Sequence, residues 1–336
     1  DVVTELAGQG SDTVITGLSL ILAANVENLI LNGTAALEGT GNGLDNSLTG
    51  NNNRNRLDGG LGQDTLTGRG GNDTYIVDNS LDQIVELAGG GTDLALAGAN
   101  FTLAANVENL TLTGSANLSG TGNGLVNIIT GNNGNNWLDG GAGADALVGG
   151  TGNDTFVVDN AGDKVAELAG GGSDTLMSSI TWVLGGAEIE NLTLTGSANI
   201  NGYGNTLNNR VNGNAGANKL DGYIGADTMS GGGGNDLYIV DNAGDVIHEN
   251  DSEGTDTVQS GLSITLSDFV ENLVLTGSGH INGSGNAQNN SIIGNGGMNT
   301  LWGQDGTDIL RGGAGNDTLN GGTGNDARYV CMGNDS

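Results

Sequence analysis

A nine-residue pattern, GGxGxDxUx, in which U is a large apolar residue, recurs along this chain of 336 residues. It is clearest at residues 59–67, 140–148, 149–157, 312–320 and 321–329, and in the last copy Arg328 stands at U. Steps of nine from these copies place an aspartate at the sixth position of each repeat: Asp64, Asp73, Asp82, Asp145, Asp154, Asp163, Asp227, Asp236, Asp245, Asp308, Asp317, Asp326 and Asp335. A carboxylate and an apolar residue held at fixed phase predict an all-β fold, a parallel β-solenoid with cations between its coils.

The two halves of the nonapeptide have different conformational preferences. Its first six residues are rich in Gly and Asn, which reach positive φ and allow tight turns. Its last three alternate polar and apolar, so a short strand should direct U into a narrow interior. These interior positions are Leu66, Tyr75, Ile84, Leu147, Phe156, Val165, Met229, Tyr238 and Ile247. Two nonapeptides should make one coil, which stacks Asp64 over Asp82, Asp145 over Asp163 and Asp227 over Asp245.

The acidic charge predicts a calcium-dependent fold. The chain has 39 acidic and 8 basic residues, a formal charge of −31. Stacked carboxylates repel one another unless a divalent cation lies between them, and oxygen-only ligation suits Ca2+ better than Zn2+ or Mg2+. Further candidate ligands in this phase are Asp12, Asp93, Asp174 and Asp256, with Asp1 at the start. If each ion takes two of these aspartates, about nine ions would bind, with affinities of roughly 10⁻⁴ to 10⁻³ M, typical of extracellular modules.

The repeated GGxGxD motif resembles the RTX (repeat-in-toxin), or hemolysin-type, calcium-binding nonapeptide repeats of secreted bacterial proteins. The resemblance implies a right-handed parallel β-roll, with Ca2+ held between turns by the sixth-position Asp and backbone carbonyls. It also implies type I secretion and folding triggered by calcium outside the cell. The family includes toxins, proteases, lipases, epimerases, adhesins and surface-layer proteins, and the repeat alone does not choose among them.

A longer period lies above the nonapeptides. The sequence V/I-E-N-L begins at residues 26, 107, 189 and 270, and the same step relates Glu5, Glu86, Glu167 and Glu249. We therefore expect one continuous solenoid over 1–336, made of a partial module at 1–25, modules at 26–106, 107–188 and 189–269, and a truncated module at 270–336. The module 107–188 is one residue longer than the other two complete modules, and this extra residue lies near Gly185 and Gly186.

Some positions of the repeat are not acidic. Asn replaces Asp at Asn46, Asn55, Asn127, Asn136, Asn209, Asn218, Asn290 and Asn299. Asn allows the same turn but carries no charge for a cation, so these coils should be metal-free. Residues 93–127 and their equivalents lack the Gly-x-Asp turn, which predicts wider, calcium-free coils.

Other acidic residues are open to two interpretations. A structural ladder is favoured over an extra cation site for Glu27, Glu108, Glu190 and Glu271. Asp78, Asp159 and Asp241 could equally be ligands or solvated turn residues.

Composition excludes several classes of function. His248 and His280 stand in unrelated phases, and Cys331 is alone, so a nucleophile–base set and an internal disulfide have no basis. We expect no enzyme activity. Binding to nucleic acid or anionic membranes is disfavoured by the charge, and no segment is long and apolar enough to insert in a membrane.

Two functions remain from these observations. One is a rigid structural rod in an extracellular or cell-surface adhesin, surface-layer or matrix filament protein, and the alternative is the calcium-folding tail of a secreted enzyme or toxin. Ice binding is weaker, because Thr does not recur from coil to coil. The sequence begins in mid-repeat without a capping unit, which predicts end-to-end self-association or continuation in a longer chain.

Overall fold

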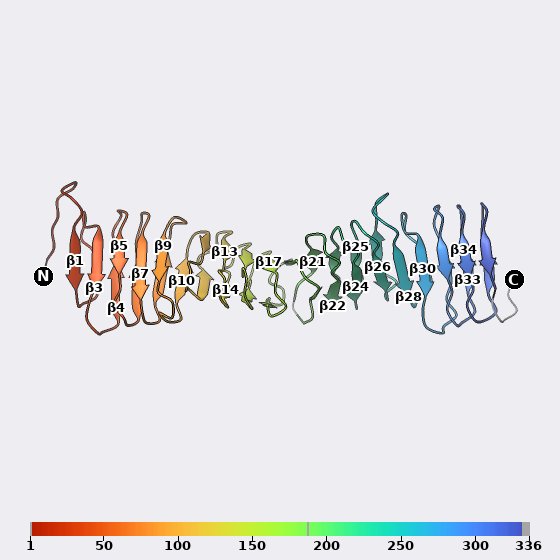
Figure 1. The fold of residues 1–336 in the computed structure, drawn as a ribbon, viewed down its shortest axis with the longest axis horizontal. Coiled ribbons are helices and arrows are strands. Elements are labelled where there is room, and N and C mark those ends of the chain that lie inside the picture. The colour runs from red at the N-terminus through yellow and green to blue at the C-terminus, as the bar shows by residue number, and fades with distance from the viewer. Residues whose placement is uncertain (1, 187, 331–336) are drawn as a thin grey trace. The chain divides into compact units, whose positions relative to one another are not determined.

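The computed structural model describes residues 2–186 and 188–330. In this part of the chain all regular secondary structure is β-strand. The chain divides into two units, Asp1–Asp174 and Thr175–Ser336. Within each unit, successive coils place their strands side by side in parallel pairs (Figure 1). This confirms the predicted parallel β-solenoid. Asp1, Asp335 and Cys331, for which the sequence made predictions, lie outside the described residues.

In the first unit, odd-numbered and even-numbered strands form separate sheets. One odd sheet contains β1 (Thr13–Thr16), β3 (Asn28–Leu31), β5 (Ser47–Thr49), β7 (Thr65–Arg69) and β9 (Gln83–Glu86). The even sheet contains β2 (Leu20–Ile21), β4 (Leu37–Thr40), β6 (Asn55–Asp58), β8 (Thr74–Val77), β10 (Leu94–Ala97), β12 (Asn109–Leu112), β14 (Ile128–Thr130), β16 (Ala146–Val148) and β18 (Lys164–Ala166). The odd strands resume with β11 (Phe101–Thr102), β13 (Ser119–Thr121), β15 (Trp137–Asp139) and β17 (Thr155–Val158).

The second unit repeats this arrangement. Its first odd set is β19 (Thr175–Ser178), β21 (Asn191–Leu194), β23 (Arg210–Asn212), β25 (Thr228–Ser230) and β27 (Val246–His248). Its even sheet is β20 (Trp182–Val183), β22 (Gly202–Asn205), β24 (Lys219–Tyr223), β26 (Leu237–Val240), β28 (Thr257–Ser260), β30 (Asn272–Leu275), β32 (Ser291–Ile293), β34 (Ile309–Arg311) and β36 (Ala327–Tyr329). A last odd set is β29 (Ile264–Thr265), β31 (Gly283–Ser284), β33 (Thr300–Trp302) and β35 (Thr318–Asn320).

The register confirms that two nonapeptides make one coil. Leu48 pairs with Leu66, and Leu66 pairs with Ile84, so identical positions of every second nonapeptide stack. The turns allow this close stacking because they contain glycine. Gly60 has φ of +81°, and a Cβ there would collide with the carbonyl of Asn42 in the neighbouring coil.

The coils between the nonapeptides are uneven in length. Thr74 pairs with Leu94 in a coil of 20 residues, and Leu94 pairs with Asn109 in a coil of 15 residues. Asn109 then pairs with Ile128 in a coil of 19 residues. The coil made of two nonapeptides has 18 residues. Wider coils were predicted for residues 93–127, but of the two coils there the first is narrower than the coil of two nonapeptides and only the second is wider. The coil of 20 residues precedes this segment.

The U side chains form a buried column in the core. Tyr75, Phe156 and Tyr238 are its largest members and are fully buried. Of the predicted interior positions only Val165 is half-buried, while the others are buried. Among the residues the structure describes, no helix has the length and apolar character needed to cross a membrane.

Candidate metal centres

The sixth-position aspartates form ladders that join successive coils. The backbone N–H of Asn46 donates to Asp64 Oδ1 at 2.7 Å, and the N–H of Asp64 donates to Asp82 Oδ1 at 2.9 Å. The same bonds join Asp145 to Asp163 at 2.9 Å and Asp227 to Asp245 at 3.1 Å. The predicted stacking of these three pairs is therefore confirmed.

In each ladder the first aspartate of the stacked pair has one oxygen without a protein partner, whereas Oδ2 of Asp82, Asp163 and Asp245 accepts backbone N–H groups. The Oδ2 atoms are buried without a hydrogen bond in Asp64, Asp145, Asp227 and Asp308. An orphaned buried carboxylate oxygen is costly, so it points to a ligand or to a proton. Burial raises the pKa of Asp64 to about 6, in spite of the Asn46 N–H, and the charges of Asp82 and Asp78 add to the rise. These oxygens fit a cation bound by oxygen ligands.

The asparagine positions are satisfied by the chain itself. Asn46 Oδ1 accepts the N–H of Asn42 at 2.7 Å, and Asn46 Nδ2 donates to the carbonyls of Val26 and Glu27 at 3.1 and 3.3 Å. The asparagine amide thus has partners for both its oxygen and its nitrogen, whereas Asp64, Asp145, Asp227 and Asp308 each have one oxygen without a hydrogen bond. This difference supports the prediction of metal-free asparagine coils.

Three groups of carboxylates bring possible ligand atoms within 4.8 Å of one another. We call them the triads: Asp73, Glu86 and Asp93; Asp154, Glu167 and Asp174; and Asp236, Glu249 and Asp256. In each group the two aspartates stack with a spacing of 20 residues, as in the bond from the N–H of Asp73 to Asp93 Oδ1 at 2.7 Å. Each glutamate joins its aspartate pair from a different part of the coil.

The triad carboxylates are strongly perturbed. Burial raises the pKa of Asp73 to about 7, and the charges of Glu86 and Asp93 contribute. Burial likewise raises the pKa of Glu167 and of Glu249 to about 7. Three acids packed this closely cannot all ionise without a counter-charge.

Sequence reasoning assigned the triad aspartates as ligands and missed the glutamates. The signal was present, because Glu86, Glu167 and Glu249 recur with the module step. They lie outside the GGxGxD frame, so the motif did not mark them.

The Glu of the V/I-E-N-L sequence makes ladder bonds. Glu27 Oε2 accepts the N–H of Asp12 at 2.9 Å, and Glu108 Oε2 accepts the N–H of Asp93 at 2.8 Å. Glu271 Oε2 accepts the N–H of Asp256 at 2.8 Å. These bonds favour the structural interpretation of this set.

The other predicted residues differ in their surroundings. Asp12 Oδ2 is buried without a hydrogen bond, and Asp317 Oδ1 accepts the N–H of Asn299 at 2.8 Å. Asp326 already has a cationic partner, because Arg328 Nη2 lies 3.5 Å from its carboxylate. Burial raises the pKa of Asp78, Asp159 and Asp241, and the neighbouring charges of Asp82, Asp163 and Asp245 add to the rise. His248, the last residue of β27, and His280 are both exposed.

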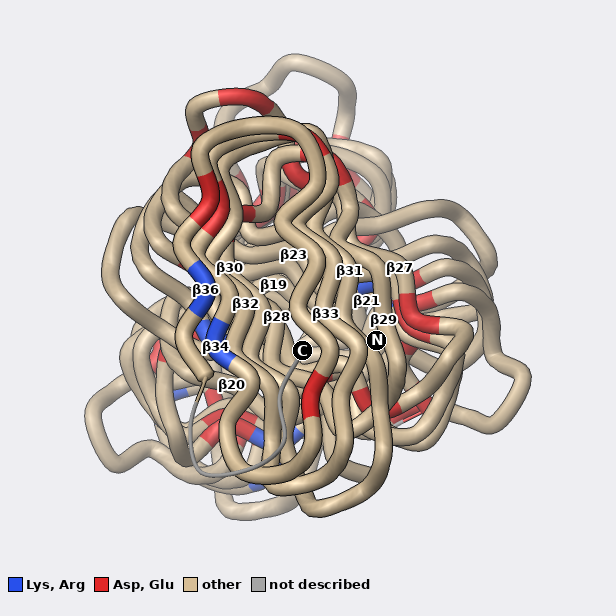
Figure 2. Tube along the Cα trace, turned by 90° about the vertical axis from the view of Figure 1, so that its right-hand side faces the viewer, with Lys and Arg blue, Asp and Glu red and all other residues tan. Residues whose placement is uncertain are grey.

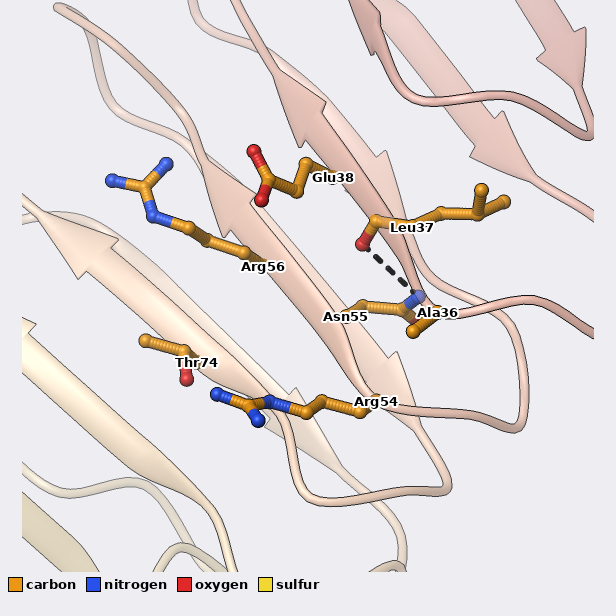
Figure 3. A pocket seen from close by; sticks show the side chains of 7 residues that line it. All are labelled: Ala36, Leu37, Glu38, Arg54, Asn55, Arg56 and Thr74. Atoms are coloured by element: carbon orange, nitrogen blue, oxygen red, sulfur yellow. Dashed lines mark hydrogen bonds between the residues drawn. The ribbon is translucent and has the colours of Figure 1, made fainter.

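Figure 2 shows few basic residues along the Cα trace, and two of the blue Lys and Arg positions lie at β34 and β36. The red Asp and Glu positions gather mainly in the turns. A surface hollow is lined by Arg54, Arg56, Glu38 and Thr74 (Figure 3). Asn55 and Leu37 also line it, and Asn55 Nδ2 donates to the Leu37 carbonyl at 3.4 Å. The hollow is open, and two of its lining residues adjoin the first triad: Thr74 follows Asp73, and the N–H of Asn55 donates to Asp73 Oδ1.

The comparison with protein families agrees with this geometry. The profile described as the RTX calcium-binding nonapeptide repeat (4 copies) matches residues 40–75, 121–156, 203–238, 284–310 and 293–327, the last two overlapping. These segments belong to the RTX calcium-binding nonapeptide repeat family. The first three RTX matches end at Tyr75, Phe156 and Tyr238, before the triad glutamates. No curated protein matches the chain.

Proposed function

We propose that this chain is a calcium-folded structural segment of a secreted bacterial protein. The observation that carries the proposal is the set of buried Oδ2 atoms without a hydrogen bond, at Asp64, Asp145, Asp227 and Asp308. Ca2+ is a divalent cation that accepts six to eight oxygen ligands in flexible geometry. The RTX family of the matched segments agrees with this choice of ion.

In this proposal the aspartate ladders have two roles. The Oδ1 atoms bond the N–H of the preceding coil and set the spacing of the turns. The Oδ2 atoms are the ligands, together with turn carbonyls. Neutralising these acids removes the repulsion within a chain of charge −31, so coil stacking becomes favourable only with the ion present.

The calcium affinity expected for these sites supports a location outside the cell. Extracellular calcium modules bind at roughly 10⁻⁴ to 10⁻³ M, which keeps the coils loose inside a cell and folded outside it. A role in an adhesin, surface layer or matrix filament uses the solenoid as a rigid spacer, and export by type I secretion suits a chain that folds late. The second candidate, the non-catalytic tail of a secreted enzyme or toxin, uses the same repeats.

Self-association is a further part of the proposal. The strands β1 and β36 each have one paired neighbour in the described residues, and free strand edges pair readily. Further coils, of a second copy or of the same chain, would satisfy these edges.

A pair of substitutions in one ladder tests the assignment of calcium to the aspartates. The slope of the unfolding free energy against the logarithm of calcium concentration counts the ions taken up on folding. Asp145→Asn should lower this slope by the equivalent of about one ion. Asn127→Ala keeps the backbone N–H that donates to Asp145 Oδ1, so it should leave the slope unchanged. It should still cost about 1–3 kcal/mol at every calcium concentration, because its amide bonds are lost.

Urea unfolding at a series of calcium concentrations measures both quantities. Equal slopes for Asp145→Asn and the unmutated chain would contradict the assignment.

A further inference from the structure

The triads lie where one of the two sheets is interrupted. Glu86 is the last residue of β9, which ends its sheet, and the odd strands resume only at β11. Asp73 and Asp93 directly precede β8 and β10, which pair in the even sheet. A triad therefore joins the final strand of the interrupted sheet to two adjacent strands of the continuous one.

The second unit has the same arrangement. Glu249 directly follows β27, the last strand of its sheet, and β29 begins the next set. Asp236 and Asp256 directly precede β26 and β28, which pair with each other. The recurrence of this geometry shows that the triad belongs to the module and is not an accident of one loop.

Buried oxygens without hydrogen bonds point into the triads. Asp73 and Asp93 are at most 1 % exposed, and Asp236 is 2 % exposed, yet the Oδ2 atom of each has no partner. Glu249 Oε2 is a fourth such atom. The ion pairs of the described residues, Arg56–Asp58, Lys219–Asp221 and Arg328–Asp326, lie elsewhere.

The oxygens converge on a glycine. A methyl group added at Gly68 would meet Tyr75 Oη, Glu86 Oε1 and Asp73 Oδ2 together. At Gly231 the corresponding atoms are Asp236 Oδ2 and Tyr238 Oη. Only glycine leaves room for this gathering of oxygen atoms.

We propose that each triad is a divalent-cation site of its own, separate from the pairs Asp64–Asp82, Asp145–Asp163 and Asp227–Asp245, and that it ties the end of the interrupted sheet to its neighbour. The proposal rests on the calcium-dependent fold proposed above and extends it to Glu86, Glu167 and Glu249. Three carboxylates offer more ligand charge than a stacked pair, and ligand charge tunes calcium affinity. The triads therefore fill at lower calcium concentration than the pairs.

The residue at U distinguishes the three sites. The hydroxyls of Tyr75 and Tyr238 donate to Oε1 of Glu86 and Glu249. Phe156 has no hydroxyl, and Glu167 Oε1 instead accepts the N–H groups of Leu168 and Gly150 at 2.7 and 3.1 Å. Each glutamate is thus oriented by a donor, and Phe at this position is compatible with the fold.

The test uses the full chain with Glu86→Gln, Glu167→Gln and Glu249→Gln, singly and together. Equilibrium dialysis with radioactive calcium should show the loss of one ion for each triad changed, beginning with the ions that bind first. Asp145→Asn is the matched control, since it should remove an ion that binds later. Glutamine retains the shape of the side chain and removes only its charge.

Terbium luminescence excited through tyrosine gives a second measurement, because Tb3+ takes the same oxygen ligands. Tyr75→Phe with Tyr238→Phe, which imitates Phe156, should remove most of the sensitised emission at low terbium. Tyr203→Phe should not, because Tyr203 stacks on Tyr223 at 6.0 Å, away from the triads.

Unchanged calcium counts and midpoints in the single and triple glutamine variants, with one ion lost in Asp145→Asn, would overturn the triad proposal alone. Absence of calcium binding by the unmutated chain would instead overturn the proposed function. If the triple variant does not fold, the single variants and the tyrosine variants decide.

Discussion

Removal of calcium at pH 7.5 is expected to unfold the coils. Far-ultraviolet circular dichroism should show mostly disordered chain in EGTA and β-sheet after addition of about 5 mM calcium, a concentration above the affinity range of such modules. The physical reason is the burial of aspartates such as Asp64, Asp145 and Asp227, whose Oδ2 atoms have no protein partner. Without a cation, folding at this pH must bury these charges against one another.

Magnesium at the same concentration is the matched control, because its demand for octahedral geometry and its reluctance to dehydrate suit these turns poorly. A compact chain with full β-sheet in EGTA, and no response to calcium, would contradict the account.

Acid is expected to replace calcium in part. Without calcium, burial raises the pKa of Asp64 and Asp227 to about 6, and that of Asp73 and Glu249 to about 7. The unfolded chain releases these protons near pH 4. The folded state therefore gains stability that is complete below about pH 4 and is lost as pH rises through 6 to 7.

In calcium-free buffer, circular dichroism should thus show more β-sheet at pH 5 than at pH 7.5. With calcium the direction reverses: the ligands must be deprotonated, so the calcium concentration needed for folding should fall as pH rises. Light scattering should accompany the measurement, because a chain that carries less negative charge at pH 5 than at pH 7.5 aggregates more readily. A calcium-free chain that is more folded at pH 7.5 than at pH 5 would show that the buried carboxylates do not govern folding.

Much of the fold could be predicted from periodicity. The nine-residue spacing fixed which residues share a face, so the stacking of Leu48, Leu66 and Ile84 and the burial of Tyr75 followed from the pattern. The Asp ladders followed from the same phase, because a repeat that keeps its phase keeps its register. The difference between Asp and Asn turns was predicted from charge, and the saturated amide of Asn46 gives it a structural basis.

The triads could not be predicted in the same way. Their aspartates are 20 residues apart, because the loop that follows Glu86 leaves the nonapeptide frame. In that loop the N–H of Gly90 bonds the Leu87 carbonyl at 2.9 Å. A glutamate is usually exposed, so nothing local in the sequence marked Glu86 as buried. The uneven lengths of the coils between the nonapeptides likewise depend on how loops close, which the repeat does not specify.

The most direct test of the central claim, that the orphaned carboxylate oxygens are calcium ligands, is an anomalous-difference map from crystals grown with calcium. The account predicts peaks within about 2.3–2.6 Å of carboxylate oxygens at the stacked aspartate pairs and at the triads. It predicts none beside Asn46, Asn127 or Asn209, whose amides bond the chain itself. Ordered coils in calcium with no peak beside Asp64, Asp145 or Asp227 would contradict it.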